Sequence, residues 1–370
     1  MSSRLTSGLA LAAAFIVPHA HAQGADPGWQ ACAGLTDGNA RLQCFDTWAT
    51  RQQAPGPAPA PQPAQAPAPA PTVAAAPAVL GEEEGCHDPS ATELSRMWEL
   101  EPRTSCGTFG LRGYRPLSLS LVWSNKVNQQ PTSENPANNA PEPRPYRTFE
   151  TKIQLSLRSK LGEGMLRKGD LSDSLWFAYT QQSYWQLFTE DLSRPFRNTD
   201  HEPEVFYIYP FDQALGDSGW RLRYGGFGLS HQSNGQDLPL SRSWNRVFIM
   251  GGVEKKDFTL QAKLWKRVPE NAATDDNPDI TDYIGRGELV AGWVTPKRNR
   301  WFFTWRTPFN HLDRGSARLQ WMIPARSPFS GTRFGSLYFH TQVFTGYGDS
   351  LLDYNKARTV LSFGLSLYDW

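Results

Sequence analysis

The sequence predicts an all-β fold, a twelve-stranded antiparallel transmembrane β-barrel that follows an N-terminal periplasmic extension. From about residue 115 onward, apolar residues alternate with polar ones over stretches of about ten residues, as in barrel strands that face lipid on one side. Tyrosine and tryptophan lie near the ends of these stretches, where a membrane meets water. The last stretch ends on Trp370, and a terminal aromatic residue is typical of outer-membrane barrels.

The composition agrees with a membrane barrel and gives no indication of nucleic acid as a partner. The 370 residues carry a net charge of +1 and include 14 Trp, 12 Tyr and 20 Phe. Mean hydropathy is negative. No run of eighteen apolar residues follows the amino terminus, which excludes a transmembrane helix in the mature chain. A barrel is also polar on average, because only alternate residues face lipid.

Residues 1–22 have the pattern of a secretory signal peptide. A positive charge at Arg4 precedes a short apolar core, and a small-x-small cleavage site follows at 20–22. A transmembrane anchor is the alternative, but the apolar core is too short to span a bilayer. We therefore expect the mature protein to leave the cytoplasm.

The segment between the signal peptide and residue 80 falls into two parts. Residues 23–50 contain two cysteines and predict a short helix from Ala31 to Trp48. Residues 51–80 are mostly Ala, Pro and Gln, a composition that cannot bury a core. This second part predicts a disordered tether in the periplasm, and no motif in it identifies a binding partner.

Residues 81–114 predict a short helical lead-in to the barrel. Ser90 and Glu93 stand at capping-box spacing and indicate where its helix begins. The N-terminal region contains all the cysteines of the chain, namely Cys32, Cys44, Cys86 and Cys106. Disulfides are the plausible use of these thiols in an oxidising compartment. Four cysteines allow three pairings, of which the sequential pairing is the simplest.

The barrel domain, residues 115–370, divides into twelve amphipathic segments. Leu117, Leu119 and Leu121, for example, alternate with serines. The predicted strands lie near 116–124, 147–160, 173–187, 203–211, 219–232, 243–252, 256–268, 282–294, 298–307, 315–324, 334–346 and 358–370. Twelve is even, as single-chain bacterial barrels require. A soluble β-sandwich is the alternative, but it needs neither such long strands nor the terminal aromatic residue.

One connection joins two strands that carry candidate catalytic residues. The longer connections are predicted at 125–145, 188–202, 234–242 and 269–281, and barrels have long loops on the outer side of the membrane. His231 and Ser233 are two residues apart and so share one face of a strand. If the chain turns back as a hairpin, the residue numbers of opposite positions add up to a constant. His231 can then lie opposite Asn245, because the pairs 231/245 and 233/243 have the same sum. The three side chains then converge as in a Ser-His-Asx triad.

Each of these residue types has a chemical role in such a triad. Serine is a weak nucleophile until a base removes its proton, and histidine does this near neutral pH. The third residue fixes the imidazole tautomer and supports the cation that forms. On a lipid-facing surface, the neutral amide of Asn245 avoids a carboxylate near hydrocarbon.

The stretch from His231 to Arg246, with its Ser-Asn-Gly and Ser-Arg-Ser-Trp-Asn-Arg motifs, resembles the active-site region of the outer-membrane phospholipase A family, also called detergent-resistant phospholipase A. Three further stretches agree with that family in the same order, at 179–203, 274–281 and 346–355. The second of them reads Thr-Asp-Asp-Asn-Pro-Asp-Ile-Thr and matches nearly residue for residue. The resemblance covers residues 90 to 370 approximately.

The resemblance implies an outer-membrane enzyme that hydrolyses phospholipid acyl esters, as a phospholipase A1 and A2, through an acyl-enzyme. His231 matches the general base, Ser233 the nucleophile and Asn245 the orienting residue. The backbone N–H of Gly235 matches an oxyanion-hole donor. These residues would lie on the outer, lipid-facing surface of the barrel, which meets phospholipid when the asymmetry of the bilayer is disturbed.

The resemblance also implies a homodimer that depends on Ca²⁺. The positions that match metal ligands are Gln236 and Ser241 on one chain, Ser193 on the partner subunit and, for a second position in the monomer, Asp276. The family usually has an arginine where this chain has Gln236, and a carboxylate where this chain has Leu238. Two positions match the dimer interface, Gln181 and Trp185.

Two other functions compete with this one. A non-catalytic porin or structural barrel would carry a degenerate site, whereas His231, Ser233 and Asn245 are all present here. An acyl hydrolase acting on lipopolysaccharide is the third possibility, and the residues around Asp276 and Ser193 favour the phospholipase over it. Taken alone, the acidic stretch at 275–279 also fits a solvated turn around its Asn-Pro pair.

Overall fold

The computed structural model describes residues 32–52, 88, 90–328 and 331–368. The chain divides into two compact units, Met1–Ala76 and Pro77–Trp370. The predicted signal peptide and nearly all of the predicted tether lie outside the described residues. No helix in the described ranges is both long enough and apolar enough to cross a membrane.

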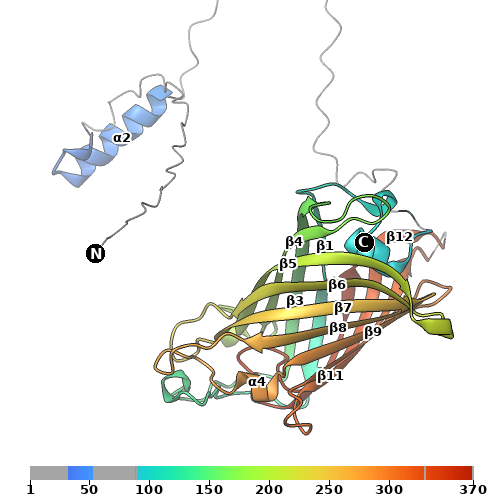
Figure 1. The fold of residues 1–370 in the computed structure, drawn as a ribbon. Coiled ribbons are helices and arrows are strands. Elements are labelled where there is room, and N and C mark those ends of the chain that lie inside the picture. Colours follow the sequence, from blue (N-terminus) through green and yellow to red (C-terminus); the bar gives the residue numbers. More distant parts are fainter. Residues whose placement is uncertain (1–31, 53–87, 89, 329–330, 369–370) are drawn as a thin grey trace, which may run out of the picture. The chain divides into compact units, whose positions relative to one another are not determined.

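The first unit contains helix α2, Gly38–Gln52 (Figure 1). The predicted start at Ala31 was wrong for this helix, because the Asp37 side chain caps it by accepting a hydrogen bond from the Ala40 N–H over 2.8 Å. A disulfide joins Cys32 to Cys44 with a Cα–Cα distance of 5.4 Å, which confirms the sequential pairing for these two cysteines. Cys106 is also disulfide-bonded, whereas Cys86 lies outside the described residues.

The second unit begins with a short lead-in, in which α3 spans Glu93–Trp98. Thr92 caps this helix through the Ser95 N–H, so the predicted capping box was wrong. Ser90 instead forms hydrogen bonds with the Asp88 carboxylate. The apolar side of α3, with Leu94 and Trp98, packs inside the end of the barrel against buried aromatic side chains of the strands.

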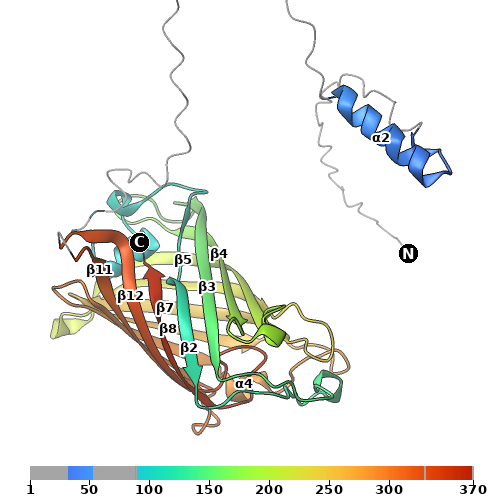
Figure 2. The same ribbon diagram turned by 180° about the vertical axis from the view of Figure 1, so that it is seen from behind.

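Twelve antiparallel strands close the barrel, as predicted. They are β2 (Leu117–Ser124), β3 (Phe149–Glu163), β4 (Ser174–Trp185), β5 (Asn198–Ala214), β6 (Arg221–Ser233), β7 (Ser243–Lys255), β8 (Phe258–Arg267), β9 (Gly287–Val294), β10 (Arg300–Thr307), β11 (Ser316–Arg326), β12 (Arg333–Gly346) and β13 (Arg358–Leu367). Each strand pairs with the next, and β13 pairs with β2 to close the sheet (Figures 1 and 2). A thirteenth, very short strand, β1 (Leu111–Gly113), pairs with β3 beyond the end of β2.

Short helices lie in the lead-in and in the connections between strands. They are η1 (Pro102–Thr104), η2 (Pro136–Asn138), η3 (Glu190–Leu192), η4 (Gly216–Ser218) and α4 (Ile280–Tyr283). The last of these corrects the predicted start of β9 at residue 282, because the chain is helical there and the strand begins at Gly287.

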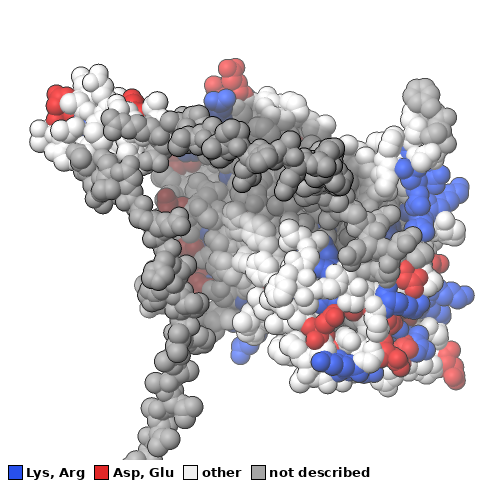
Figure 3. Space-filling view, turned by 90° about the horizontal axis from the view of Figure 1, so that it is seen from above, with Lys and Arg blue, Asp and Glu red and all other residues white. Residues whose placement is uncertain are grey.

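Strand β5 begins at Asn198, five residues before the predicted start. The inward side chains of its first half are charged and buried, including Asp200, Glu202 and Glu204. Polar residues on the inward side give no hydrophobic alternation, so the sequence pattern missed this half. The outward side chains of the barrel strands are in large part apolar and exposed. The face of the molecule in Figure 3 shows basic and acidic side chains beside one another, next to an uncharged stretch.

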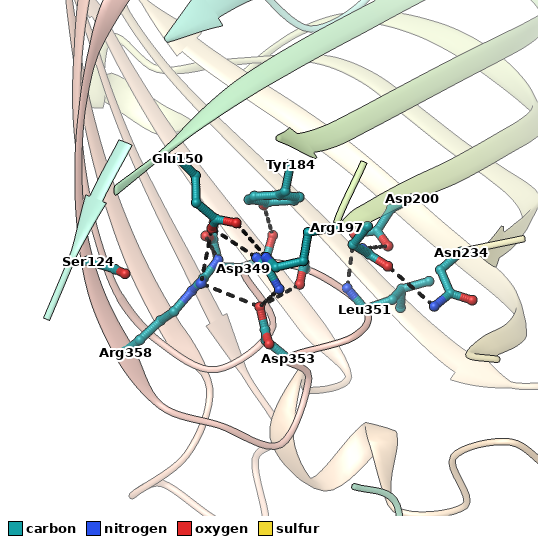
Figure 4. Close-up of polar contacts among 12 residues, drawn as sticks. Ser124, Glu150, Tyr184, Arg197, Asp200, Asn234, Asp349, Leu351, Asp353 and Arg358 are labelled. Atoms are coloured by element: carbon teal, nitrogen blue, oxygen red, sulfur yellow. Dashed lines mark hydrogen bonds and ion pairs between the residues drawn. The ribbon is translucent and has the colours of Figure 1, made fainter. Parts of the chain in front are cut away.

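A buried cluster of ion pairs fills the barrel at the end that carries the 347–357 connection (Figure 4). We call it the charged cluster, and its members are Glu150, Arg197, Asp349, Asp353 and Arg358. Arg197 binds Glu150 through Nη2 at 3.0 Å and Asp353 through Nη1 at 3.1 Å. Arg358 Nη2 lies 2.6 Å from Asp349 Oδ2. These side chains are at most 3% exposed, so the pairs fix the connection inside the barrel mouth.

Hydrogen bonds lead from this connection to the β6–β7 loop. The Leu351 N–H donates to Asp200 over 2.9 Å, and Asn198 donates to the other oxygen of Asp200 over 2.6 Å. Asn234 in turn donates to the Asn198 side-chain oxygen over 3.3 Å (Figure 4). The interior of the barrel therefore supports the loop that begins directly after Ser233.

Candidate active site

Strands β6 and β7 form the hairpin that the sequence predicts, with the predicted register. His231 is paired with Asn245, and Ser233 is paired with Ser243. His231 Nδ1 lies 2.9 Å from Asn245 Oδ1. The candidate base and the candidate orienting amide are therefore in hydrogen-bond contact, and the candidate nucleophile lies two residues along the same face of β6.

The three residues lie on the outer surface of the barrel. On β6, His231 follows Phe227 and Leu229 on the same face, and both of these side chains are about 60% exposed. Ser230, which lies between Leu229 and His231 in the sequence, faces the opposite side of the strand and is buried. A shallow apolar groove extends along this outer surface, lined in part by Val205, Phe227, Leu229, Val247, Ile249 and Leu264. The polar site therefore lies at the end of an apolar surface.

The Ser233 hydroxyl is held by the loop that follows it. Ser233 Oγ accepts a hydrogen bond from the Gly235 N–H over 3.1 Å, and within the described part of the chain no hydrogen bond joins Ser233 to His231. Gly235 has a φ of +60°, a left-handed conformation that favours glycine. This turn aims the backbone N–H of residue 235 at the atom that would bond to a substrate carbonyl carbon.

Asn234 closes the β6–β7 loop from inside. Its side-chain oxygen accepts from the Arg242 N–H over 2.9 Å, and its amide nitrogen donates to the Leu240 carbonyl over 2.8 Å. The backbone N–H of Asn234 also donates to the Arg242 carbonyl. Because Asn234 is buried, these bonds fix the position of the neighbouring Gly235.

The structure brings together two of the four predicted metal ligands. The Ser241 hydroxyl donates to Asp276 Oδ2 over 2.7 Å, and Ser243 donates to the same oxygen over 3.2 Å. The other carboxylate oxygen of Asp276 accepts from Asn138 over 3.0 Å. In the described ranges, no cluster of three or more His, Cys, Asp and Glu side chains has metal-site geometry. A cation at Asp276 would therefore depend on neutral oxygen ligands as well.

The other two predicted ligands have different contacts. The Gln236 side chain donates to the Arg197 carbonyl and to Asn198 at the start of β5. The Ser193 hydroxyl donates to the Glu190 carbonyl beside η3. The side chain of Leu238 is 62% exposed and offers no oxygen. A single chain thus gathers only part of the predicted ligand set.

Gln181 and Trp185, the predicted interface residues, lie on the outer face of β4. Trp185 donates from its indole nitrogen to the Ser193 carbonyl over 2.8 Å. Gln181 is paired with His201 of β5, and His201 is paired in turn with Ser233 of β6. Gln181 and the candidate nucleophile therefore belong to one row of residues across neighbouring strands.

Sequence reasoning missed two polar residues beside the site. His201 accepts or donates a 2.6 Å hydrogen bond at Nδ1 with the Tyr179 hydroxyl, and it was assigned to a loop because β5 was predicted too short. Glu270, in the β8–β9 connection, accepts a hydrogen bond from Asn245 Nδ2 over 3.4 Å. Burial raises the pKa of the Glu270 carboxyl, and the nearby Arg267 opposes this rise. No local motif marks Glu270, because the fold of a long connection creates its contact.

Comparison with known proteins agrees with this architecture. The family model described as phospholipase A1 matches residues 94–367. The phospholipase A1 of Klebsiella pneumoniae is 33% identical over 302 residues, which are 80% of this chain and 96% of the relative. Outer membrane phospholipase A from Escherichia coli has a TM-score of 0.59 and 31% identity, covering 70% of this chain and 94% of the solved one. The Salmonella typhi outer membrane phospholipase dimer with bound calcium gives a TM-score of 0.59 and 31% identity, covering 70% and 93%. The chain therefore belongs to the phospholipase A1 family of outer-membrane β-barrel hydrolases.

Proposed function

We propose that this enzyme hydrolyses the acyl esters of membrane phospholipids, with A1 and A2 activity, by means of Ser233, His231 and Asn245 and with the help of Ca²⁺. The observation that carries the proposal is the 2.9 Å contact between His231 and Asn245 next to Ser233 on the outer face of the β6–β7 hairpin. A nucleophile and an oriented base on a lipid-facing surface suit a substrate that is itself part of the membrane.

The geometry supports an acyl-enzyme route. When His231 Nδ1–H donates to Asn245 Oδ1, the Nε2 lone pair is left to accept the Ser233 proton. Ser233 Oγ then attacks the ester carbonyl carbon, and His231 returns the proton to the departing lysophospholipid oxygen. Water activated by the same imidazole hydrolyses the acyl-serine and releases the fatty acid.

The backbone N–H of Gly235 supplies the oxyanion contact in this scheme. It already points at Ser233 Oγ, and the substrate oxygen that becomes negative is attached to the carbon bonded to Oγ. A fixed backbone donor at this point stabilises the tetrahedral intermediate more than the planar ester. The apolar groove beside Leu229 and Ile249 gives the acyl chains a surface next to the reacting ester.

Calcium fits the oxygen chemistry around Asp276. Ser241 would hold it in the dimer, together with Gln236, if that residue contributes its backbone carbonyl, and Ser193 on the partner subunit, whereas Asp276 would hold the second position, in the monomer. Ca²⁺ takes six to eight oxygen ligands, more than the single chain gathers here, which supports a homodimer that completes the site. The dimer with bound calcium from Salmonella typhi is in line with this. When bound, the cation would supply positive charge for a developing oxyanion.

The proposed orientation follows the lengths of the connections. The connections at 125–148, 186–197, 234–242, 268–286 and 347–357 lie at the same end as the site, and long loops are on the outer side in bacterial barrels. The N-terminal extension would then lie in the periplasm, with Gln181 and Trp185 on the surface that meets a second copy.

Refolded full-length protein in detergent tests the proposal by its release of fatty acid from phospholipid, with Ca²⁺ or with a chelator. We expect release with Ca²⁺ that Ser233→Ala abolishes and that Ser118→Ala, a strand serine away from the site, leaves unchanged. Activity retained by Ser233→Ala would contradict the catalytic assignment, and full activity in chelator would contradict the calcium requirement alone. A folded but inactive wild type would favour the non-catalytic barrel, and activity on lipopolysaccharide alone would favour the third alternative.

A further inference from the structure

The amide of Asn245 has two ends, and only its oxygen can accept a hydrogen bond from His231 Nδ1. The amide would lose its function if it turned, because its NH₂ group would then face the imidazole N–H. In the structure the NH₂ end has an acceptor of its own, since Asn245 Nδ2 donates to Glu270 Oε1 over 3.4 Å. Glu270 therefore favours the orientation of the amide in which the oxygen faces His231 and the NH₂ group faces the carboxylate.

The backbone brings Glu270 to this position. The Val268 N–H donates to the Asn245 carbonyl over 2.8 Å, so the chain leaving β8 stays alongside β7 at the level of the triad. Glu270 follows two residues later, with its side chain 20% exposed. The connection thus has a defined place beside β7 at this point.

Arg267 holds the carboxylate from the other side. Its Nη2 lies 3.9 Å from Glu270 Oε2 and also forms an ion pair with Asp275. Its Nη1 donates to the carbonyls of Asn277 and Pro278 over 3.1 and 3.0 Å. Glu270 is therefore anchored to the same connection that carries Asp276, and it is not a freely rotating surface residue.

We propose that Glu270 is a positioning residue of the active site, which holds the Asn245 amide with its oxygen toward His231. This inference rests on the proposed function. A carboxylate that accepts from the amide N–H also polarises the amide, so that Asn245 Oδ1 supports the imidazolium better. Glu270 then supplies, through Asn245, the negative charge that an aspartate supplies directly in a Ser-His-Asp triad.

The location of the two residues explains this division of work. Asn245 lies on a membrane strand two residues before the exposed apolar residue Val247 and on the same face, where a carboxylate would be costly. Glu270 lies beyond the end of β8, next to Arg267, where a charge has a partner. A neutral amide can thus transmit the influence of a charge that stays outside the lipid-facing surface.

The test compares full-length, refolded variants by two measurements, the kcat for phospholipid hydrolysis and the rate at which an alkyl sulfonyl fluoride labels Ser233. We expect Glu270→Ala to lower both by about ten- to a hundredfold, the size of effect seen when the residue that orients a metal-binding histidine is lost. Glu270→Gln keeps an acceptor oxygen but loses the negative charge, so it should restore both rates in part. Glu142→Ala, an exposed carboxylate in the β2–β3 connection, should behave as wild type.

A double-mutant cycle separates positioning from a merely structural role. Asn245→Asp puts a carboxylate against Glu270, so it should be strongly impaired, whereas Asn245→Asp combined with Glu270→Gln should recover because the glutamine amide donates to the new aspartate. An identical effect of Asn245→Asp in both backgrounds would overturn the proposal, and so would wild-type rates in Glu270→Ala. A wild type without Ser233-dependent hydrolysis would instead contradict the proposed function. If Glu270→Ala fails to fold, the cycle still decides, because its only substitution of Glu270 is the conservative change to glutamine.

Discussion

At the scale of single residues, the proposed site depends on the His231 imidazole, whose Nδ1 lies 2.9 Å from Asn245 Oδ1. We expect His231→Ala to lower kcat by about 10²- to 10⁴-fold, because general-base catalysis commonly contributes that much. Initial rates of fatty-acid release measure this. His311→Ala, which changes a histidine in the β10–β11 connection, is the matched control. If the alanine variant at 231 kept wild-type rates, another group would have to be the base.

A second expectation at this scale concerns the carboxylate beside Ser241. Asp276→Asn retains the hydrogen bonds to Ser241 and Ser243 in part but removes the negative charge that a cation needs. Because ligand charge tunes calcium affinity, the Ca²⁺ concentration for half-maximal activity should rise about tenfold or more. A calcium titration of hydrolysis measures this, and Asp257→Asn, in the turn between β7 and β8, is the control. An unchanged titration would mean that Asp276 does not hold the cation.

At the scale of elements, strand β6 is shaped by glycine on its inward side. A Cβ at Gly228 would lie 2.5 Å from the Phe206 Cβ and 2.5 Å from the Val205 carbonyl oxygen. Backbone cannot give way easily, so we expect Gly228→Ala to destabilise the barrel by about 1–3 kcal/mol. Unfolding in denaturant, followed by tryptophan fluorescence, measures the loss. Gly162→Ala is the control, since its nearest neighbour is Met165 Sδ at 3.8 Å, and an equal effect of the two would refute the steric explanation.

How far the sequence predicts an element depends on which of its faces is apolar. The β6–β7 hairpin was predicted to the residue pair, because its outward apolar residues fix the register of His231 with Asn245. The first half of β5 was missed because buried charges, such as Glu202, replace the apolar face, and His201 was missed with it. The contact of Glu270 depends on the path of a long connection, which no periodic pattern encodes.

At the scale of the whole molecule, the charged cluster joins strands that are distant in sequence. Arg197→Met would leave Glu150 and Asp353 buried without their main partner. Breaking a buried pair on one side costs about 3–5 kcal/mol, so we expect a clear loss of stability in denaturant. The exposed pair of Arg221 with Asp212, whose side chains are 45% and 43% exposed, gives the contrast. Arg221→Met should cost at most about 1 kcal/mol, and a comparable loss in both variants would argue against a special role of the cluster.

The division into two units leads to a final expectation, that the barrel unit is sufficient for folding and catalysis. A chain that begins at Pro77 retains every strand, the closure between β13 and β2, and the residues of the site. We expect it to refold in detergent and to show the Ser233-dependent activity of the full chain. A chain that begins at Glu101 is the contrast, because it also lacks Leu94 and Trp98. Trp98 packs against Phe206 and Tyr224 at ring distances of 5.5 and 5.4 Å, and losing it leaves a cavity among buried aromatic side chains. The shorter chain should therefore unfold at lower denaturant concentration, whereas failure of the Pro77 chain to fold would show that the first unit takes part in forming the barrel.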